Sequence, residues 1–268
     1  MKNIEVKILN PQAIIEAEKM AVTAARLTQR AEKIENMEDF MNLYNKPYSE
    51  SFVENLCNMP HPTLQKFEVI NVVIVGASRR FLAQITRHQN ETKFMSGSLQ
   101  YSDYSSDDNK TDFVVPYNYL GTDIEKEYIK GCKEQFKLYE KLVVNGKELG
   151  WEDAGDAAGY AMPQGLRNVL IISATPYQWK HMIGQRVCNR NTMETQYVMT
   201  LIWKQLYEAA PALFGKVYWG CLGKGCQEGK MSCKNPLVIR TDDTAPLRTM
   251  TPSEILEYRF PKLCDGKE

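Results

Sequence analysis

The chain has 268 residues, of which 43% are hydrophobic, so it can bury the core of one large domain or of two small ones. Its 33 basic and 33 acidic residues give a formal net charge of zero, which argues against nucleic acid as a partner. No apolar run is long enough to cross a bilayer, and residues 1–11 lack the apolar core of a signal peptide. Seven cysteines, an odd number, fit a reducing compartment, so we expect a cytoplasmic protein with no membrane partner.

The first part of the chain alternates strand and helix patterns. Residues 3–8 predict a short strand, and a helix with apolar residues at helical spacing begins at Pro11. Residues 37–59 are polar and contain helical pieces. Residues 66–78, rich in Val and Ile, predict a buried strand, and residues 79–89 predict a short amphipathic helix.

The second part continues the alternation and then becomes irregular. Its predicted elements are a polar loop over 87–106, a brief strand over 112–116, a long charged helix over 122–146, a strand over 167–176, and a helical region over 178–210 with a break at 189–191. From Gly215 onward the chain is rich in Gly, Cys and Pro and reads mostly as loop. The pattern predicts an α+β fold, a single domain in which a mixed or antiparallel sheet is flanked by helices. We divide it into a folded part over 1–215 and a tail over 216–268 packed on the same domain.

A cationic stretch follows the predicted helix over 79–89. Gln84, Arg87 and His88 share one arc of that helix, beside an apolar arc that would anchor it. Glu91 is the only carboxylate before Asp103. Arg and His at a helix C-terminus can simply complement the helix dipole, and this alternative stays open.

The polar loop itself suggests an anion site. Backbone N–H groups and hydroxyls suited to phosphate oxygens come from Thr92, Ser96, Gly97, Ser98 and Tyr101. Arg87 could bind the same phosphate with both arms of its guanidinium. A serine-rich loop that is merely solvated is the alternative.

A second cationic region lies downstream. Arg167 opens the predicted strand, and Arg186 and Arg190 are one helical turn apart, where like charges repel mildly. Glu194 could neutralise Arg190 and leave Arg186 without a partner, although an ordinary solvated Arg/Glu face has the same spacing. The neighbours of Arg186 are apolar, so its head group should be half-buried and need an anionic or carbonyl partner. These neighbours are Met182, Ile183, Val187 and Cys188.

In this order the motifs resemble the flavin-dependent thymidylate synthases. The signature of that family is Arg-His-Arg followed by a Ser and a Ser-x-Arg-Tyr, with a Gln three residues before the first Arg. The matching residues here are Gln84, Arg87, His88, Ser98 and Tyr101. Upstream, His61-Pro62-Thr63 resembles the His-x-Ser/Thr of the family, and downstream Arg167, Arg186 and Glu194 resemble its second motif. The resemblance runs in order from residue 3 to residue 215.

The sequence also departs from the signature. Gln89 stands where the family has its second Arg, Thr92 stands for the Ser, and Gln100 stands for the Arg of Ser-x-Arg-Tyr. The signature is also one residue longer. These changes remove positive charges at the positions where the family holds flavin and nucleotide phosphates.

The resemblance implies a cofactor, co-substrates and roles for particular residues. It implies FAD held between subunits of a homotetramer with shared active sites, dUMP as substrate, and methylenetetrahydrofolate and NADPH as co-substrates. Arg186 would be catalytic, stabilising negative charge as C5 of the pyrimidine becomes nucleophilic. The substrate-binding residues would be Gln84, Arg87, Ser98, Gln100, Arg167 and Arg186. The cofactor-binding residues would be His61, Thr63, Arg87, His88, Gln89 and His181.

Three functions remain open at this level. The first is a thymidylate synthase of this family. The second, motivated by Gln89 and Gln100, keeps flavin and a pyrimidine nucleotide but forms a different C5 product, such as a hydroxymethyl group. The third is a nucleotide-binding relative without catalytic activity.

The cysteines allow two interpretations. Cys188 lies two residues from Arg186 and could be activated by it, but a small buried helix residue is the favoured interpretation. In the tail, four residues separate Cys221 from Cys226 and six separate Cys226 from Cys233, with Cys264 beyond them. Zinc sites use tighter pairs. We therefore assign no metal and leave a structural metal in the tail as the alternative to free thiols.

Overall fold

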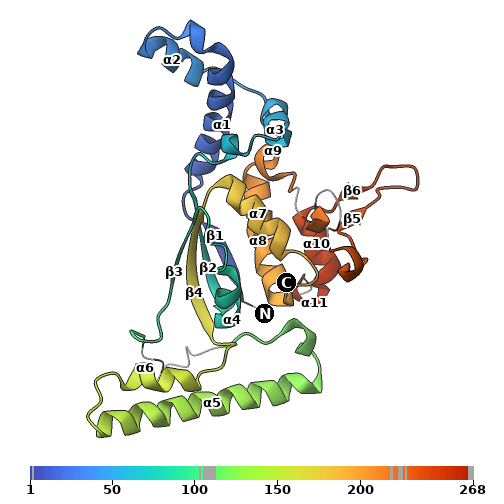
Figure 1. Cartoon of the computed structure of the whole chain (residues 1–268). Helices are drawn as coiled ribbons and strands as arrows, with labels where there is room; N and C mark the ends of the chain where they lie inside the picture. Colours follow the sequence, from blue (N-terminus) through green and yellow to red (C-terminus); the bar gives the residue numbers. More distant parts are fainter. Residues whose placement is uncertain are drawn as a thin grey trace.

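The computed structural model describes residues 1–264 apart from Lys2, Asp103, 105–112, 218–219, 223–225 and Gln227 (Figure 1). Within these residues, no helix is both long enough and apolar enough to span a membrane.

A four-stranded antiparallel sheet forms the centre of the molecule. Its strands, in spatial order, are β1 (Glu5–Ile8), β2 (Ile70–Ser78), β4 (Arg167–Ala174) and β3 (Thr92–Ser96). Val72 pairs with Ile172 across the two central strands, and the register shifts once, beside Gly76. Gly76 has φ +86°, and a Cβ there would meet the Arg167 guanidinium, so the position requires glycine.

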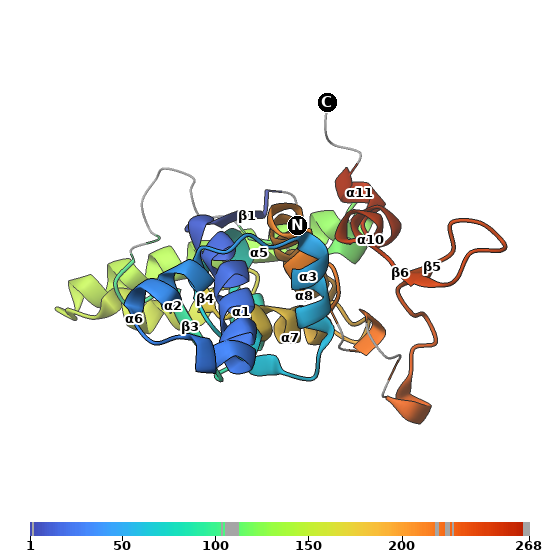
Figure 2. The same cartoon turned by 90° about the horizontal axis from the view of Figure 1, so that it is seen from above.

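Four helices build the main core with this sheet, namely α1 (Gln12–Arg30), α4 (Arg79–Ile85), α7 (Pro176–Arg186) and α8 (Met193–Ala209). Of these, α4 and α8 pack directly on its strands (Figures 1 and 2). Trp179 and Trp203 are fully buried, and their indole N–H groups donate to the carbonyl oxygens of Ile70 at 3.1 Å and Phe214 at 2.9 Å. Both rings therefore enter the core with their one polar group satisfied.

The remaining helices extend from this core. Near the N-terminus they are α2 (Met37–Tyr44) and α3 (Glu50–Asn58), and α9 (Pro211–Phe214) follows α8. The long helix α5 (Asp123–Glu148) lies beside α6 (Ala154–Ala158) at one end of the molecule (Figure 1). Tyr139, Val143 and Ala158 form a small second cluster between α5 and α6.

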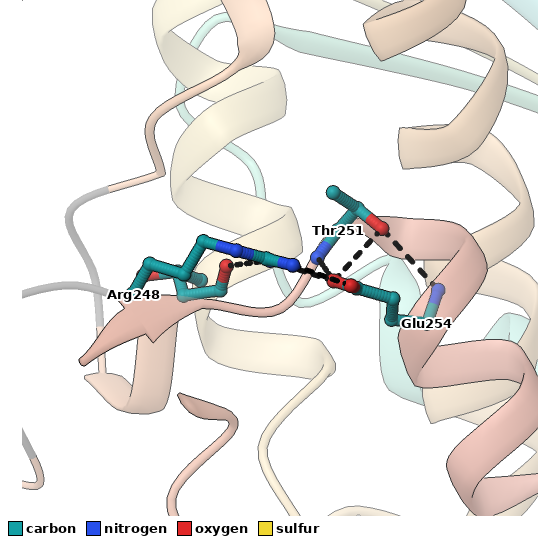
Figure 3. A network of polar contacts seen from close by, with 4 residues as sticks. Arg248, Thr251 and Glu254 are labelled. Carbon is teal, nitrogen blue, oxygen red and sulfur yellow. Dashed lines mark hydrogen bonds and ion pairs between the residues drawn. The ribbon is translucent and has the colours of Figure 1, made fainter. Parts of the chain in front are cut away.

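The tail contains more regular structure than its composition suggests. A small hairpin pairs β5 (Val238–Ile239) with β6 (Arg248–Thr249), and α10 (Pro252–Arg259) and α11 (Pro261–Cys264) follow. Thr251 and Glu254 form a capping box at the start of α10, and Arg248 binds both carboxylate oxygens of Glu254 at 2.6 and 2.8 Å (Figure 3). Residues 252–264 are therefore helical apart from Phe260, whereas the rest of the described tail is mostly loop, as predicted.

The predicted fold class is confirmed, as is the break between the last two core helices, since α7 ends at Arg186 and α8 begins at Met193. The predicted helix over 79–89 ends early, at Ile85, because His88 N–H turns back to the Ile85 carbonyl at 3.2 Å. The predicted loop over 87–106 contains β3, which pairs with β4. In the predicted strand over 112–116, only Phe113 makes a bridge, with Leu166, and Asp112 lies outside the described residues.

Candidate active site

The candidate site forms where α7 ends and α8 begins. Thr192 caps α8, its hydroxyl accepting the Thr195 N–H at 3.4 Å. The short connection over 187–192 lies against the end of α4, so two helices from different parts of the chain meet here. Gln84 joins them, since its side-chain oxygen accepts from the hydroxyls of Thr195 at 2.7 Å and Thr192 at 3.2 Å.

Arg186, the last residue of α7, is held by three acceptors. Its Nε donates to Nε2 of His88 at 2.7 Å, its Nη1 to Oδ1 of Asn191 at 3.2 Å, and its Nη2 to the Gln84 carbonyl at 2.9 Å. The expectation of a half-buried guanidinium with a carbonyl partner is confirmed. Because a guanidinium has five N–H groups, one remains on each Nη without a partner among the described residues. Arg186 is thus oriented by the protein and can still bind a ligand oxygen.

His88 must be neutral to play this part. Its Nε2 accepts a hydrogen bond from Arg186, so its proton resides on Nδ1. Burial, followed by the charges of Arg186 and His181, lowers the pKa of His88 from 6.5 to about 4. The rings of His88 and His181 meet edge to face, with centroids 5.8 Å apart. This arrangement keeps a neutral acceptor beside the guanidinium at physiological pH.

Arg87 lies next to this cluster and is exposed. Burial and then the charge of Arg87 lower the pKa of Arg186. Two arginines within electrostatic reach, one oriented and one exposed, make the end of α4 attractive to an anion. Gln89, which follows His88, is also exposed.

His61 and Thr63 lie in a different place, a groove between α1, α3 and the segment over 61–67. The groove has a volume of about 1200 Å³, and its lining includes the rings of Tyr48, Phe52 and Phe67 and the cationic side chains of Arg26, Arg30 and Lys46. Aromatic surfaces and cations are the groups that a flavin ring and its pyrophosphate require. The residues present therefore fit FAD. Gln65 ties this segment to α7, because its side-chain oxygen accepts from the buried Lys180 ammonium at 2.7 Å.

The other predicted substrate residues lie elsewhere in the single chain. Arg167 donates through Nη2 to the Asn3 carbonyl at 2.6 Å, at the first residue of β4. Ser98 follows β3, and its hydroxyl accepts the Gln100 N–H at 3.1 Å. The structure therefore brings Gln84, His88, His181 and Arg186 together, with Arg87 beside them, but sets His61 and Thr63 in the separate groove.

The predicted neutralisation of Arg190 by Glu194 is wrong. Arg190 instead pairs with Glu228 of the tail at 2.7 Å. The half-buried Glu194 carboxylate accepts from the N–H and the hydroxyl of Ser78, both at 2.6 Å, and burial raises its pKa. Helical spacing does not apply to these residues, since the chain leaves α7 at Arg186 and re-enters a helix only at Met193.

Sequence reasoning missed a long-range support of the junction. Arg259, at the end of α10, donates to the Val187 carbonyl at 2.6 Å and to the Gln196 side-chain oxygen at 2.8 Å. Gln196 in turn donates to the Asn191 carbonyl at 2.9 Å, and Asn191 binds Arg186. The Thr-Pro-Ser-Glu start of α10 indicates a helix in the sequence, but it does not indicate that this helix contacts residue 187.

The cysteines do not define a metal centre in the described part of the chain. None of the seven forms a disulfide, and no group of three or more His, Cys, Asp or Glu side chains there is arranged to hold a metal ion. Burial, followed by neighbouring Cys188, Cys233 and Cys226, raises the pKa of the Cys221 thiol to about 11.

Comparison with solved structures places the fold. The UMP/dUMP methylase PolB from Streptomyces cacaoi, bound with 5-Br dUMP, has a TM-score of 0.59 at 14% identity, covering 80% of this chain and 94% of PolB. Thymidylate synthase X from Helicobacter pylori, with FAD and dUMP, has a TM-score of 0.51 at 17% identity, covering 79% of this chain and 97% of that protein. The α+β fold is therefore that of the flavin-dependent thymidylate synthases and of a related methylase.

Sequence comparisons agree. A flavin-dependent thymidylate synthase from Thermococcus onnurineus is 25% identical over 180 residues, which cover 66% of this chain and 69% of that relative. One from Geobacter sulfurreducens is 23% identical over 184 residues, covering 68% and 75%. Residues 12–212 match the family described as thymidylate synthase complementing protein, and the chain belongs to this family. The resemblance to flavin-dependent thymidylate synthases found in the sequence is thereby confirmed.

The pKa of His88 provides a first test of this geometry. Replacing Arg186 with Ala removes a neighbouring positive charge, so the pKa of His88 should rise from about 4 toward 6.5. Hydrogen–deuterium exchange at the imidazole C2 position, followed by mass spectrometry across a pH series, measures this. In the parent protein the lowered pKa means that stability present above pH 6.5 is lost as the pH falls toward 4.

Arg190→Ala is the matched control for that experiment, because Arg190 pairs with Glu228 on the protein surface. It should leave the His88 titration unchanged. A His88 pKa near 6.5 in the parent protein would show that the buried Arg186–His88 pair does not form in solution.

Proposed function

We propose that the chain is a flavin-dependent thymidylate synthase that converts dUMP to dTMP. Methylenetetrahydrofolate donates the one-carbon unit, and FAD reduced by NADPH donates the hydride. The observation that carries this proposal is the oriented guanidinium of Arg186 within the segment that matches the family. The seven cysteines, which form no disulfide, support a reducing, cytoplasmic setting.

Arg186 acts by electrostatic stabilisation. As C5 of the pyrimidine becomes nucleophilic, negative charge develops on the ring carbonyl oxygens, and the free N–H groups of Arg186 stabilise that charge. His88, Asn191 and the Gln84 carbonyl hold the guanidinium in place before substrate arrives, so little reorganisation is needed during the reaction. His88 is neutral and leaves the positive charge on Arg186.

Other residues bind the nucleotide and the cofactor. Arg87, Arg167, Gln84, Ser98 and Gln100 position dUMP. The groove that contains His61 and Thr63 holds the flavin, with Arg87, His88, Gln89 and His181 on the side of the active-site junction. When bound and reduced, FAD supplies the hydride that completes the methyl group; the protein supplies orientation and charge. Residues 1–215 form the catalytic part, and the tail over 216–268 supports the junction.

We further propose a homotetramer in which neighbouring chains complete each active site. The face of the sheet away from α7 and α8 carries exposed apolar side chains, namely Val75 at 40%, Met95 at 72%, Val169 at 48% and Ile171 at 37% exposure. An apolar sheet face of this kind fits a second copy of the chain. The separation of the predicted site residues within one chain supports the same arrangement.

The identity of the product tests the proposed function. Purified protein should be yellow and bind FAD non-covalently. Supplied with dUMP, methylenetetrahydrofolate and NADPH, it should form dTMP, identified by mass spectrometry. Parallel reactions with UMP test the activity named for the PolB structure, and a hydroxymethyl product would support the second candidate function that Gln89 and Gln100 suggest. Colourless protein that fails to bind added FAD would exclude both enzymes.

The oligomeric state tests the shared site. Light scattering at micromolar concentration with FAD present should give the mass of a tetramer. Ile171→Lys places a charge on the apolar sheet face and should lower that mass. Met37→Lys, at an exposed position on α2, should not. A monomer mass for the parent protein would contradict the arrangement.

Arg186→Ala tests the catalytic assignment. Because Arg186 is proposed to act on charge present only in the transition state, turnover should fall about 100- to 1,000-fold while the KM for dUMP changes little. Arg186→Lys should rescue only in part, since an ammonium keeps the charge but loses the planar fork. Steady-state kinetics measure both quantities.

Arg87→Ala is the contrasting variant. Its proposed partners are phosphates, which carry the same charge in ground and transition states, so the KM should rise more than kcat falls. If Arg186→Ala instead raises the KM with kcat near the parent value, Arg186 is a binding residue and the division of roles is wrong.

A further inference from the structure

The side chain of Asn191 orients one arm of Arg186. Its Oδ1 accepts from Nη1 of Arg186 at 3.2 Å, while its Nδ2 donates to the carbonyl oxygens of Gln185 at 2.8 Å and Cys188 at 3.2 Å. The position of that Oδ1 therefore depends on the backbone of the connection over 187–192. This connection lies outside both α7 and α8, so its conformation depends on contacts from other parts of the chain.

Arg259 of α10 fixes this connection at two points. Its Nη1 donates to the Val187 carbonyl at 2.6 Å and to the side-chain oxygen of Gln196 at 2.8 Å. Gln196 is buried, and its Nε2 donates to the Asn191 carbonyl at 2.9 Å. One nitrogen of Arg259 thus joins the first residue of the connection to the side chain that holds Asn191. Without Arg259, the buried oxygen of Gln196 loses its hydrogen-bond donor.

The helix that carries Arg259 is anchored by other residues. Ile255 and Phe260 of the tail have no exposed surface. The ring of Phe260 meets the rings of Tyr117 and Tyr197 edge to face, with centroids 5.4 and 5.2 Å apart. A capping box also stabilises the start of α10. We therefore expect α10 to stay docked when the side chain of Arg259 is replaced.

Stability alone is a weak explanation for a buried arginine at this position. Burial lowers the pKa of Arg259, and its buried Nη2 makes no hydrogen bond with any described residue. A buried guanidinium with an unsatisfied N–H group costs folding free energy. The family match ends at residue 212, so Arg259 also lies beyond the segment that the match covers. Its contacts nevertheless converge on the connection that orients Arg186.

We propose that Arg259 is a positioning residue of the active site, which acts on Arg186 through Gln196 and Asn191. The inference rests on the proposed function of Arg186. Arg259 has no part in binding substrate. It holds the connection so that Asn191 keeps the guanidinium of Arg186 oriented before substrate arrives. The tail is then required for catalysis as well as for folding.

Arg259→Met tests the proposal, because methionine keeps an unbranched apolar stem but has neither the donors nor the charge. The kcat for dTMP formation should fall about 10- to 100-fold, whereas the KM for dUMP should change little. Arg259→Lys keeps a charged donor and should recover part of kcat. Lys262→Met is the matched control, because Lys262 also ties the tail to the core, through the Leu120 carbonyl at 2.7 Å, away from the junction. Its kcat should equal that of the parent.

A double variant separates an action through Arg186 from any other. In the Arg186→Ala background, Arg259→Met should cause no further loss of kcat, because the group that Arg259 positions is absent. A further loss of the size seen in the parent background would show that Arg259 acts by another route and would overturn the proposal.

The titration of His88 tests the same contact without turnover. If Arg259→Met loosens Arg186, the nearby positive charge moves away and the pKa of His88 should rise above about 4. Exchange at the imidazole C2 position measures this in ligand-free protein. A His88 pKa equal to that of the parent would overturn the proposal.

The remaining outcomes also decide. Equal losses of kcat in Arg259→Met and Lys262→Met would mean that only docking of the tail matters and would overturn the proposal. If Arg259→Met does not fold, Arg259→Gln, which keeps a polar group of shorter reach, takes its place in every measurement. Parent protein that forms no dTMP contradicts the proposed function itself, and the His88 titration then still decides whether Arg259 positions Arg186.

Discussion

The antiparallel pairing of β2 with β4 is the constraint on which the site depends. Because the strands run in opposite directions, α4 leaves the sheet at one end, after Ser78, and α7 leaves it at the other end, after Ala174. Both helices return over the same face. Each residue adds about 1.5 Å to a helix, so α4 and α7 advance roughly 10 and 16 Å. The sum of these two advances is similar to the length of one central strand, so the helix ends meet. That meeting places His88 and Gln84 against Arg186.

The meeting point then depends on polar groups that satisfy one another. Gln84 offers its carbonyl to Arg186 and its side-chain oxygen to two threonines, and Ser78 offers its N–H and hydroxyl to Glu194. In a half-buried setting each missing partner costs the desolvation of the group left behind. The network therefore fixes the conformation of the junction, and the lowered pKa of His88 keeps the acceptor of Arg186 available down to pH values far below neutrality.

The sequence predicts the parts of the molecule that depend on local pattern. Apolar periodicity identified the two central strands, the long helix α5 and the break between α7 and α8, and the apolar neighbours of Arg186 indicated a carbonyl partner. The sequence did not predict the edge strand β3, because its residues alternate around a single partly buried aromatic, Phe94, within a polar stretch. The sequence did not predict the partner of Arg190, the donors to Glu194 or the contact of Arg259, because these interactions join residues far apart in the chain.

The contact of Arg259 with residue 187 has a consequence for how the site forms during synthesis. A ribosome releases the chain from its N-terminus, and the sheet is complete once residue 174 has emerged. The carbonyl of Val187 and the side chain of Gln196 obtain their arginine only when α10 follows, more than 60 residues after them. A nascent chain therefore assembles its central sheet well before its active-site junction receives its last support. The surroundings of Arg186 are therefore completed late, and translation that stops before residue 252 leaves the junction without the contacts of Arg259.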